Sequence, residues 1–342
     1  MIFTKAKFDP TVIVGTNLKE FGNRNFRNGK GEYLVIEADE YHKSFLNHSP
    51  FAAMITNIDR EHLDFYKNLG EIKKVFLKFI SNIKPGGILV VNRDNKNLFS
   101  LKSNIEKIAK VNDLKVFWYG FNSPSLKNVK NKIEKVIKIP GDHNVSNCLG
   151  IYLVAKAIGI KDKDIFDTIG SYRGAWRRME YRGKFMIHDS RSMVHVYDDY
   201  AHHPTEIKAT LSGLAKKYPE HNLICVFQPH QAKRLACLFK EFTEAFDDAD
   251  NLILLDIYKV AGRDEVSQNP NSLMLKTAIE KRISRPNYKG RLKRAIYILH
   301  PNNLKNEIIK TFNDSSFILH DSGIVVMMGA GDIVNYTSKL LK

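Results

Sequence analysis

The sequence predicts an α/β fold of two domains, and three observations lead to that prediction. Short apolar runs alternate with helical patterns over almost the whole chain, which favours mainly parallel sheets covered by helices. A length of 342 residues suits two or three domains. The alternation pauses near residues 181–184, after an arginine-rich turn, so we expect domains at 1–182 and 183–342.

The expected strands are short, apolar and rich in β-branched residues. They lie at 11–15, 33–38, 52–58, 87–92, 116–119, 194–200, 223–227, 252–257, 295–299 and 324–328. The expected helices lie between them, at 69–83, 145–158, 204–217, 231–246, 272–282, 303–312 and 332–341. Residues 259–287 are rich in turn formers and charge, and we interpret them partly as loop.

Composition indicates a globular protein of a reducing, cytoplasmic compartment. No apolar run approaches the roughly 18 residues that a membrane-spanning helix needs, and the first ten residues do not form a signal peptide. Three cysteines without CxxC spacing indicate neither zinc nor a disulfide framework. The net charge of +16 is spread over lysine-rich helices and loops, without a nucleic-acid motif. We therefore expect a surface that attracts anionic nucleotides and no nucleic-acid partner.

The segment 196–206, VYDDYAHHPTE, carries the strongest local signal of a site. Asp199 and His202 would lie at the carboxyl end of a strand, where open α/β sheets bind ligands. Pro204 and Glu206 favour a helix that begins there. The alternative is a solvated polar turn.

Two other predicted strands end in acidic residues and a histidine. Glu37 opens the run EADE, and His62 lies in the run DREHLD. Carboxylates at neighbouring strand ends suit Mg²⁺, which prefers oxygen ligands and shares its shell with phosphates. The alternatives are an acidic exit from a strand and a structural imidazole.

Amide and basic side chains complete the candidate set. Asn144 and Asn147 are three residues apart, so both can face a purine or ribose from one helix turn, or they can cap that helix. Arg178 lies in a run of two arginines that suits bidentate phosphate contact or surface salt bridges. His230 ends a strand, and Arg234 follows four residues later on the same helix face. The turn at 329–332, GAGD, is weak evidence for phosphate binding.

Taken in order, these motifs resemble the Mur ligases of peptidoglycan synthesis, with the closest likeness to the branch that adds L-alanine to UDP-N-acetylmuramate. The matching runs are EADEYHKSFL, TNIDREHLDFY, GDHNVSN, RRME, DDYAHHPTE, FQPH, LLDIY and MGAGD. The resemblance implies a central ATP-binding domain, incomplete at its N-terminus, followed by a Rossmann-like C-terminal domain. It also implies ATP-dependent amide-bond formation, in which the muramate carboxylate is converted to an acyl phosphate that the amine of L-alanine attacks.

The resemblance assigns roles to the residues of these motifs. Glu37 and His62 would serve catalysis at a metal–phosphate site with Mg²⁺, and Asn144 and Asn147 would hold the base and ribose of ATP. Arg178 and Asp199 would act in catalysis and contact ATP when the domains close.

The substrate-binding residues implied by the resemblance come from the later motifs. His202, His230 and Arg234 would bind the amino acid or the muramoyl carboxylate.

The sequence departs from the family pattern at three places. The UDP-sugar domain and the glycine-rich GxxGKT(S/T) loop are absent, so we expect a fragment or shortened form that lacks about one domain, roughly 100 residues, and little turnover unless a separate chain supplies that domain. Glu61 replaces the usual Asp, and Gln231 replaces an arginine. The alternatives are a ligase that recycles murein peptides onto the same sugar nucleotide, and a non-catalytic nucleotide-binding remnant.

Overall fold

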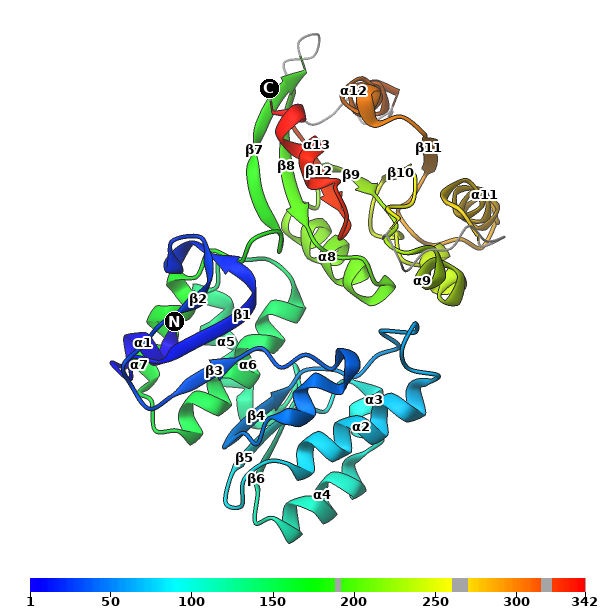
Figure 1. The fold of residues 1–342 in the computed structure, drawn as a ribbon. Coiled ribbons are helices and arrows are strands. Elements are labelled where there is room, and N and C mark those ends of the chain that lie inside the picture. The colour runs from blue at the N-terminus through cyan, green and yellow to red at the C-terminus, as the bar shows by residue number, and fades with distance from the viewer. Residues whose placement is uncertain (188–191, 260–269, 315–321, 342) are drawn as a thin grey trace. The chain divides into compact units, whose positions relative to one another are not determined.

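The computed structural model describes residues 1–187, 192–259, 270–314 and 322–341, and the chain forms two compact units, Met1–Ala175 and Trp176–Lys342 (Figure 1). The boundary expected from the sequence, between 182 and 183, lies inside strand β7 (Glu180–Ile187), which belongs to the sheet of the second unit. The arginine-rich turn that precedes β7 is also part of the second unit. Each unit has its own sheets and core and is described by itself.

The second unit is built on one six-stranded sheet, ordered β11-β10-β9-β12-β8-β7. Five strands are parallel, and β7 pairs antiparallel with β8 at one edge. Strands β9 and β10 are buried along their whole length, as expected for parallel strands that helices cover on both faces. The remaining strands are β8 (Ser192–Asp199), β9 (Asn222–Phe227), β10 (Asn251–Leu255), β11 (Arg294–Ile298) and β12 (Ser322–Met328).

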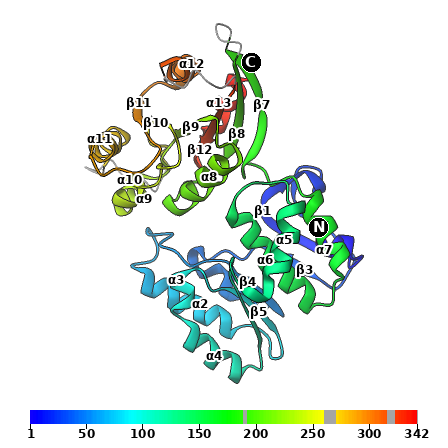
Figure 2. The same ribbon diagram turned by 180° about the vertical axis from the view of Figure 1, so that it is seen from behind.

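Helices pack on both faces of this sheet (Figure 2). Helix α12 (Leu304–Asp314) and α13 (Val334–Leu340) pack Leu304, Ile308 and Leu340 against one face. On the other face, Phe227 of β9 contacts Phe242 and Phe246. The other helices of the unit are α8 (Pro204–Lys217), α9 (Ala232–Cys237), α10 (Phe239–Thr243), α11 (Ser272–Ile283) and the 3-10 turn η4 (Pro301–Asn303).

The first unit contains two three-stranded sheets, β4-β5-β6 and β2-β1-β3. The first of these is parallel and is covered on one face by α2 and α4, whose apolar residues share a core with Leu89 and Val91 of β5. Helices α5, α6 and α7 contribute to the core on the other face, with Ile88 and Val90. These strands are β4 (Ala52–Ile55), β5 (Ile88–Asn92) and β6 (Lys115–Tyr119), and the helices are α2 (Leu69–Ser81), α4 (Lys102–Val111), α5 (Lys127–Val136), α6 (Asp142–Ala157) and α7 (Asp162–Ser171).

The small sheet β2-β1-β3 carries apolar side chains that are exposed. Leu34, Val35 and Ile36 of β3 (Leu34–Ile36) are 58%, 36% and 36% exposed, although consecutive strand residues face opposite sides. Among the described residues β3 pairs only with β1 (Thr11–Leu18), so its other edge carries no strand. The other elements of the first unit are β2 (Arg24–Arg27), α1 (Ile2–Lys5), α3 (Lys96–Phe99) and the 3-10 turns η1 (Lys19–Phe21), η2 (Tyr41–Asn47) and η3 (Pro124–Leu126).

The structure confirms the α/β class and all ten expected strands, and it corrects several bounds. The strand expected at 33–38 ends at Ile36, and the helix expected at 145–158 begins at Asp142. The helix expected at 231–246 is two short helices, because the backbone at Leu238 leaves the helical region. Residues 260–269 of the expected loop lie outside the described residues. No helix in the described part of the chain is long and apolar enough to cross a membrane.

Candidate functional site

Three motifs of the second unit meet at the carboxyl ends of adjacent strands. Asp199 is the last residue of β8, Gln228 follows β9, and Gly329 follows β12, which lies between β8 and β9. The backbone N–H of Gly329 donates to the carbonyl of Asp199 at 3.1 Å, and that of Gln228 donates to Met328 at 3.0 Å. The parallel register therefore gathers segments that are far apart in sequence, at the edge where such sheets bind ligands.

Asp199 is buried and holds the arginine-rich turn. One carboxylate oxygen accepts the N–H of Met179 at 2.8 Å, and the other accepts the N–H of Ala201 at 2.7 Å. Burial raises the pKa of Asp199 to about 6. Because both oxygens bind backbone donors, this side chain fixes the turn on which Arg178 stands.

The two adjacent arginines have different environments. Arg177 is 3% exposed, and its guanidinium donates to the carbonyls of Gly329 and, at 3.3 Å, Gly331. Burial lowers the pKa of Arg177. The Arg178 side chain is 49% exposed and forms an ion pair with Glu206 at 3.4 Å. Arg177 thus anchors the GAGD turn, whereas Arg178 is accessible to a ligand.

The two histidines at the start of α8 also differ. His203 is the N-cap, with its Nδ1 accepting the N–H of Thr205 at 3.2 Å, and Glu206 closes a capping box. The Glu206 carboxylate accepts the N–H of His202 at 3.0 Å and lies 3.4 Å from its Nδ1. Burial would raise the pKa of Glu206, but the charges of His202 and Arg178 lower it to about 2. Glu206 therefore remains ionised and holds His202 and Arg178 together.

His230, which follows β9, and Arg234 of α9 join this group. The His202 and His230 rings lie edge to face, with centroids 5.9 Å apart, and His230 stacks on Tyr258 at 5.7 Å. Arg234 Nη1 donates to His230 Nδ1 at 3.2 Å, which fixes that nitrogen as an acceptor. Five of the predicted residues, Arg178, Asp199, His202, His230 and Arg234, therefore belong to one connected cluster, which we call the β8–β9 site.

In the first unit, His62 lies with two carboxylates. Its Nε2 is 3.2 Å from Glu40 Oε1, and one ligand atom from each of Asp39, Glu40 and His62 lies within 4.8 Å of the others. Tyr41 packs on the imidazole at 4.8 Å, and its hydroxyl donates to Asp64 at 3.2 Å. His62 adopts a φ of 53°, which non-glycine residues rarely adopt. We call this group the His62 cluster.

The donor set of the His62 cluster fits a divalent cation. Two carboxylates offer the hard oxygen ligands that Mg²⁺ prefers, and the imidazole offers a nitrogen. Burial would lower the pKa of His62, but the hydrogen bond to Glu40 and the negative charges of Glu61, Glu40 and Asp39 raise it. A bound cation would compete with the proton on His62.

Replacing Glu40 with glutamine should lower the pKa of His62 towards its ordinary value of 6.5, because the acceptor loses its charge. An NMR titration of the imidazole protons measures this shift, with the exposed Glu32→Gln as a matched control. Because the folded-state pKa is raised, protonated His62 stabilises the fold below pH 6.5, and this contribution is lost as pH rises through the folded pKa. An unchanged His62 pKa in Glu40→Gln would contradict the assignment of this contact.

The remaining predicted residues of the first unit are Glu37, Asn144 and Asn147. The Glu37 carboxylate accepts the N–H of Gly15 at 2.6 Å and is not one of the three groups around His62. Asn144 and Asn147 lie in the first turns of α6, as expected, and Asn144 Nδ2 donates to the carbonyl of Pro140 at 2.6 Å.

The sequence interpretation missed functional side chains next to the predicted ones. The sequence interpretation uses Glu206 only as a sign of a helix start, although its position three residues after His203 is that of a capping box. Tyr258 ends the run LLDIY, to which the sequence interpretation gives no role, because its contact with His230 forms between segments far apart in sequence.

Comparison with known proteins identifies both units. The sequence model of the Mur ligase middle domain matches residues 20–155, and that of the "Mur ligase, glutamate ligase domain" matches 177–331. A UDP-N-acetylmuramate–L-alanine ligase of Clostridium botulinum is 37% identical over 348 residues, covering 96% of this chain and 69% of the relative.

Solved structures show the same fold. The crystal structure of a UDP-N-acetylmuramate–alanine ligase from Thermotoga maritima matches 99% of this chain and 70% of its own, with a TM-score of 0.69 and 20% identity. A murein peptide ligase of Psychrobacter arcticus matches 99% of this chain and 72% of its own, with a TM-score of 0.58 and 19% identity. With both domain matches and the identity to the clostridial relative, the chain belongs to the Mur ligase family of ATP-dependent amide-forming ligases.

Proposed function

We propose that this chain forms the amide-bond-forming part of a ligase that joins L-alanine to UDP-N-acetylmuramate with ATP. The observation that carries this proposal is the β8–β9 site, where the cationic groups of Arg178 and Arg234 lie with His202 and His230 at one sheet edge. Such groups suit the carboxylates and phosphates of an acyl-phosphate reaction. The name of the clostridial relative supports the choice of substrates.

In the second unit we assign Arg178 to the phosphates of ATP, because its guanidinium is accessible and is held by Glu206. Asp199 acts on the same step by positioning the backbone of the arginine turn at Met179. His202, His230 and Arg234 are assigned to the muramoyl carboxylate and the amino acid. In this arrangement the carboxylate and the amine would be fixed before they react, which is the main source of rate in such a transfer.

In the first unit we assign Glu37 and His62 to the metal–phosphate site, and Asn144 and Asn147 to the base and ribose. Support for the metal comes from the carboxylates beside His62. When bound there, Mg²⁺ would neutralise charge on the phosphates. Asn144 and Asn147 are three residues apart at the start of α6, so their amides can serve one ligand.

We further propose that an additional segment supplies the phosphate-binding loop, from the same protein or from a separate chain. The motif GxxGKT(S/T) does not occur in these 342 residues, and its lysine and backbone amides are the main phosphate contact in such sites. The exposed apolar side chains of β3 support a segment that packs beside it, and so does its outer edge, which pairs with no strand in the described part of the chain.

The test compares the purified chain with a fusion to the part of the clostridial relative that this chain does not match. Phosphate release is measured with UDP-N-acetylmuramate, ATP and L-alanine, and the product mass is determined. We expect turnover from the fusion only, dependent on all three substrates, and about 100-fold slower or worse in a fusion with His62→Ala. The exposed Glu32→Gln fusion is the control.

Two further results would show which acceptor the ligase uses and whether the chain is catalytic. A fusion that uses a murein tripeptide in place of L-alanine would support the recycling ligase, a reaction named for the Psychrobacter arcticus structure. A folded fusion that binds nucleotide and releases no phosphate with any acceptor would identify a non-catalytic remnant and overturn the proposal.

A further inference from the structure

The β8–β9 site contains two imidazoles that lie beside groups of opposite charge. His202 lies beside the Glu206 carboxylate, and His230 lies beside the Arg234 guanidinium. The two rings contact each other edge to face, with centroids 5.9 Å apart. Because the partner of one ring nitrogen decides where the proton sits on a neutral imidazole, these neighbours give the two residues different chemistry.

The Nδ1 atom of His202 carries a hydrogen. It lies 2.9 Å from the carbonyl oxygen of Tyr200 and 3.4 Å from a carboxylate oxygen of Glu206, and neither oxygen can donate. The lone pair of the neutral ring therefore belongs to Nε2, which can take up a proton. Burial would raise the pKa of Glu206, but the charges of His202 and Arg178 lower it to about 2. The same attraction stabilises the imidazolium that forms, as the carboxylate of a hydrolytic triad does.

His230 has the reverse arrangement. The Arg234 guanidinium donates to its Nδ1 at 3.2 Å and to its backbone carbonyl at 3.3 Å, and the ring stacks on Tyr258. A guanidinium accepts no hydrogen bond, so Nδ1 is the acceptor and the hydrogen of the neutral ring is on Nε2. A second proton would have to displace Arg234 from Nδ1. His230 is therefore a hydrogen-bond donor at Nε2 and not a base.

We propose that His202 Nε2 is the general base that takes a proton from the ammonium group of the incoming amino acid, while His230 and Arg234 hold its carboxylate. This role rests on the proposed function and separates residues that bind the amino acid from the one that activates it. An ammonium group has no lone pair and cannot attack an acyl phosphate, so the reaction needs a base. A carboxylate only accepts hydrogen bonds, which suits the Nε2–H of His230 and the guanidinium of Arg234.

The step balances without a further reactant. One proton passes from the ammonium nitrogen to His202 Nε2, and the freed lone pair forms the C–N bond to the acyl carbon. The C–O bond to phosphate breaks, and the phosphate leaves with that electron pair and with a second proton of the nitrogen. The side chain of His202 is 16% exposed, so its imidazolium can return the proton to solvent.

Nitrogen-15 NMR of the histidine rings tests the two tautomers in the unmodified chain, without turnover. We expect neutral His202 to carry its hydrogen on Nδ1 and His230 to carry it on Nε2. His203 is an internal reference, because its Nδ1 accepts the backbone N–H of Thr205 and its hydrogen must be on Nε2. A hydrogen on Nε2 of neutral His202 would overturn the base role.

Two nucleophiles separate a base from a structural residue in the fusion. His202→Asn keeps a donor for the oxygens at Nδ1 and removes the base, so phosphate release with L-alanine should fall roughly 100-fold or more. Hydroxylamine is uncharged near pH 7 and needs no base, so the variant should form the hydroxamate as fast as the unmodified fusion does. Equal losses with both nucleophiles would show a structural role and overturn the proposal. Absence of hydroxamate from the unmodified fusion would instead overturn the proposed function, and the base role with it.

The pH profile of the fusion tests the contact with Glu206. The described groups around His202 include Glu206, Arg178, Asp199, His230 and Arg234. Glu206→Gln keeps the capping box and removes the charge that stabilises the imidazolium. His202 then loses its proton at lower pH, so the acid limb of phosphate release with L-alanine should move to lower pH while the maximum rate falls.

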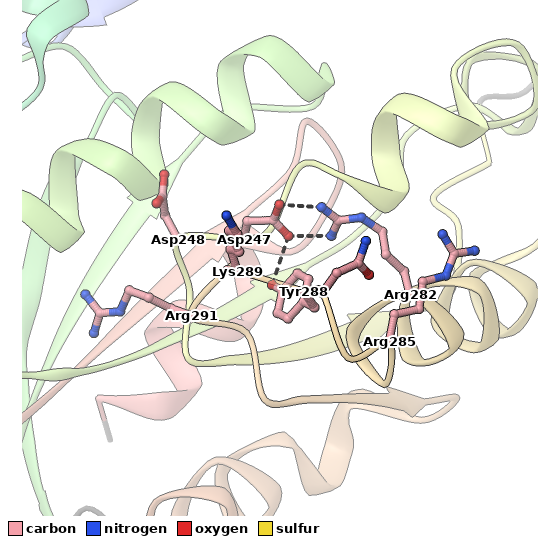
Figure 3. A pocket seen from close by; sticks show the side chains of 9 residues that line it. Asp247, Asp248, Arg282, Arg285, Tyr288, Lys289 and Arg291 are labelled. Atoms are coloured by element: carbon pink, nitrogen blue, oxygen red, sulfur yellow. Dashed lines mark hydrogen bonds and ion pairs between the residues drawn. The ribbon is translucent and has the colours of Figure 1, made fainter.

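Asp248→Asn is the matched control for this change of charge. Asp248 lies before the amino end of β10, and in Figure 3 its carboxylate points away from the ion pair of Asp247 and Arg282. We expect the acid limb of this variant to stay where it is in the unmodified fusion. An acid limb that does not move in Glu206→Gln, or that moves equally in Asp248→Asn, would contradict the proposal.

Discussion

Replacing Arg177 with alanine should lower the free energy of unfolding by roughly 3 kcal/mol or more, because hydrogen bonds from a buried charged donor contribute about 1.5–3 kcal/mol each. Arg177 is 3% exposed and donates to the carbonyls of Gly329 and Gly331. Alanine would leave these acceptors without their donor and would remove the aliphatic stem that fills the space between them. Urea denaturation of the variant, with unchanged m-value, measures the loss.

Arg178→Ala is the matched control, since it is the same substitution at the next residue. The Arg178 side chain is 49% exposed and forms a surface ion pair with Glu206. Such a pair contributes at most about 1 kcal/mol to the free energy of unfolding. Phosphate release by the fusion should fall more in Arg178→Ala than in Arg177→Ala, because Arg178 is the arginine that we propose contacts ATP. Equal losses of stability in the two variants would contradict the anchoring role of Arg177.

Replacing Asp199 with alanine should lower the free energy of unfolding by about 2–4 kcal/mol at pH 5. The substitution leaves the N–H groups of Met179 and Ala201 buried without an acceptor, and each such group costs about 1–3 kcal/mol. The control is Asp256→Ala, because Asp256 also lies at the carboxyl end of a strand, directly after β10, but is exposed. A loss no larger than that of the control would show that the turn does not depend on Asp199.

Asp199 also gives the stability a defined pH dependence. Its folded pKa is about 6, raised from 3.8 by burial, so the folded state holds the proton more tightly than the unfolded chain does. Protonated Asp199 therefore contributes to the free energy of unfolding below about pH 4, and this contribution is lost as pH rises through 6. The unfolding free energy of the unmodified chain, relative to Asp199→Asn, should fall by up to roughly 3 kcal/mol across this window. A difference that is flat with pH would contradict the raised pKa.

The sequence predicts the elements of this fold well where pattern alone decides them. Apolar runs located β9 and β10, because a strand buried on both faces is apolar at every position. Pro204 and Glu206 located the start of α8, because both belong to the first turn of a helix. Helix α9 and α10 were expected as one, since the break at Leu238 follows from a backbone angle that no residue type there signals.

Sequence motifs indicate which residues belong to the candidate site, but they do not predict the burial or the contacts of each side chain. Arg177 and Arg178 are the same residue type in adjacent positions, so only burial against the GAGD turn distinguishes the anchor from the exposed group. The sequence also could not choose among the carboxylates of EADE. The chain leaves the strand after Ile36 and turns, so strand alternation no longer predicts which of them faces His62.

The exposed strand β3 has a consequence for how this chain behaves in concentrated solution. Among the described residues no strand pairs with the outer edge of β3, so the backbone of this edge, flanked by Leu34, Val35 and Ile36, is a template on which another extended chain can add. Natural proteins usually protect such an edge with charge, proline or a bulge, and β3 itself carries none of these. Attraction between apolar edges is not screened by salt, so the overall positive charge would oppose self-association least at high ionic strength. Low salt and an added edge charge should therefore reduce self-association of this chain.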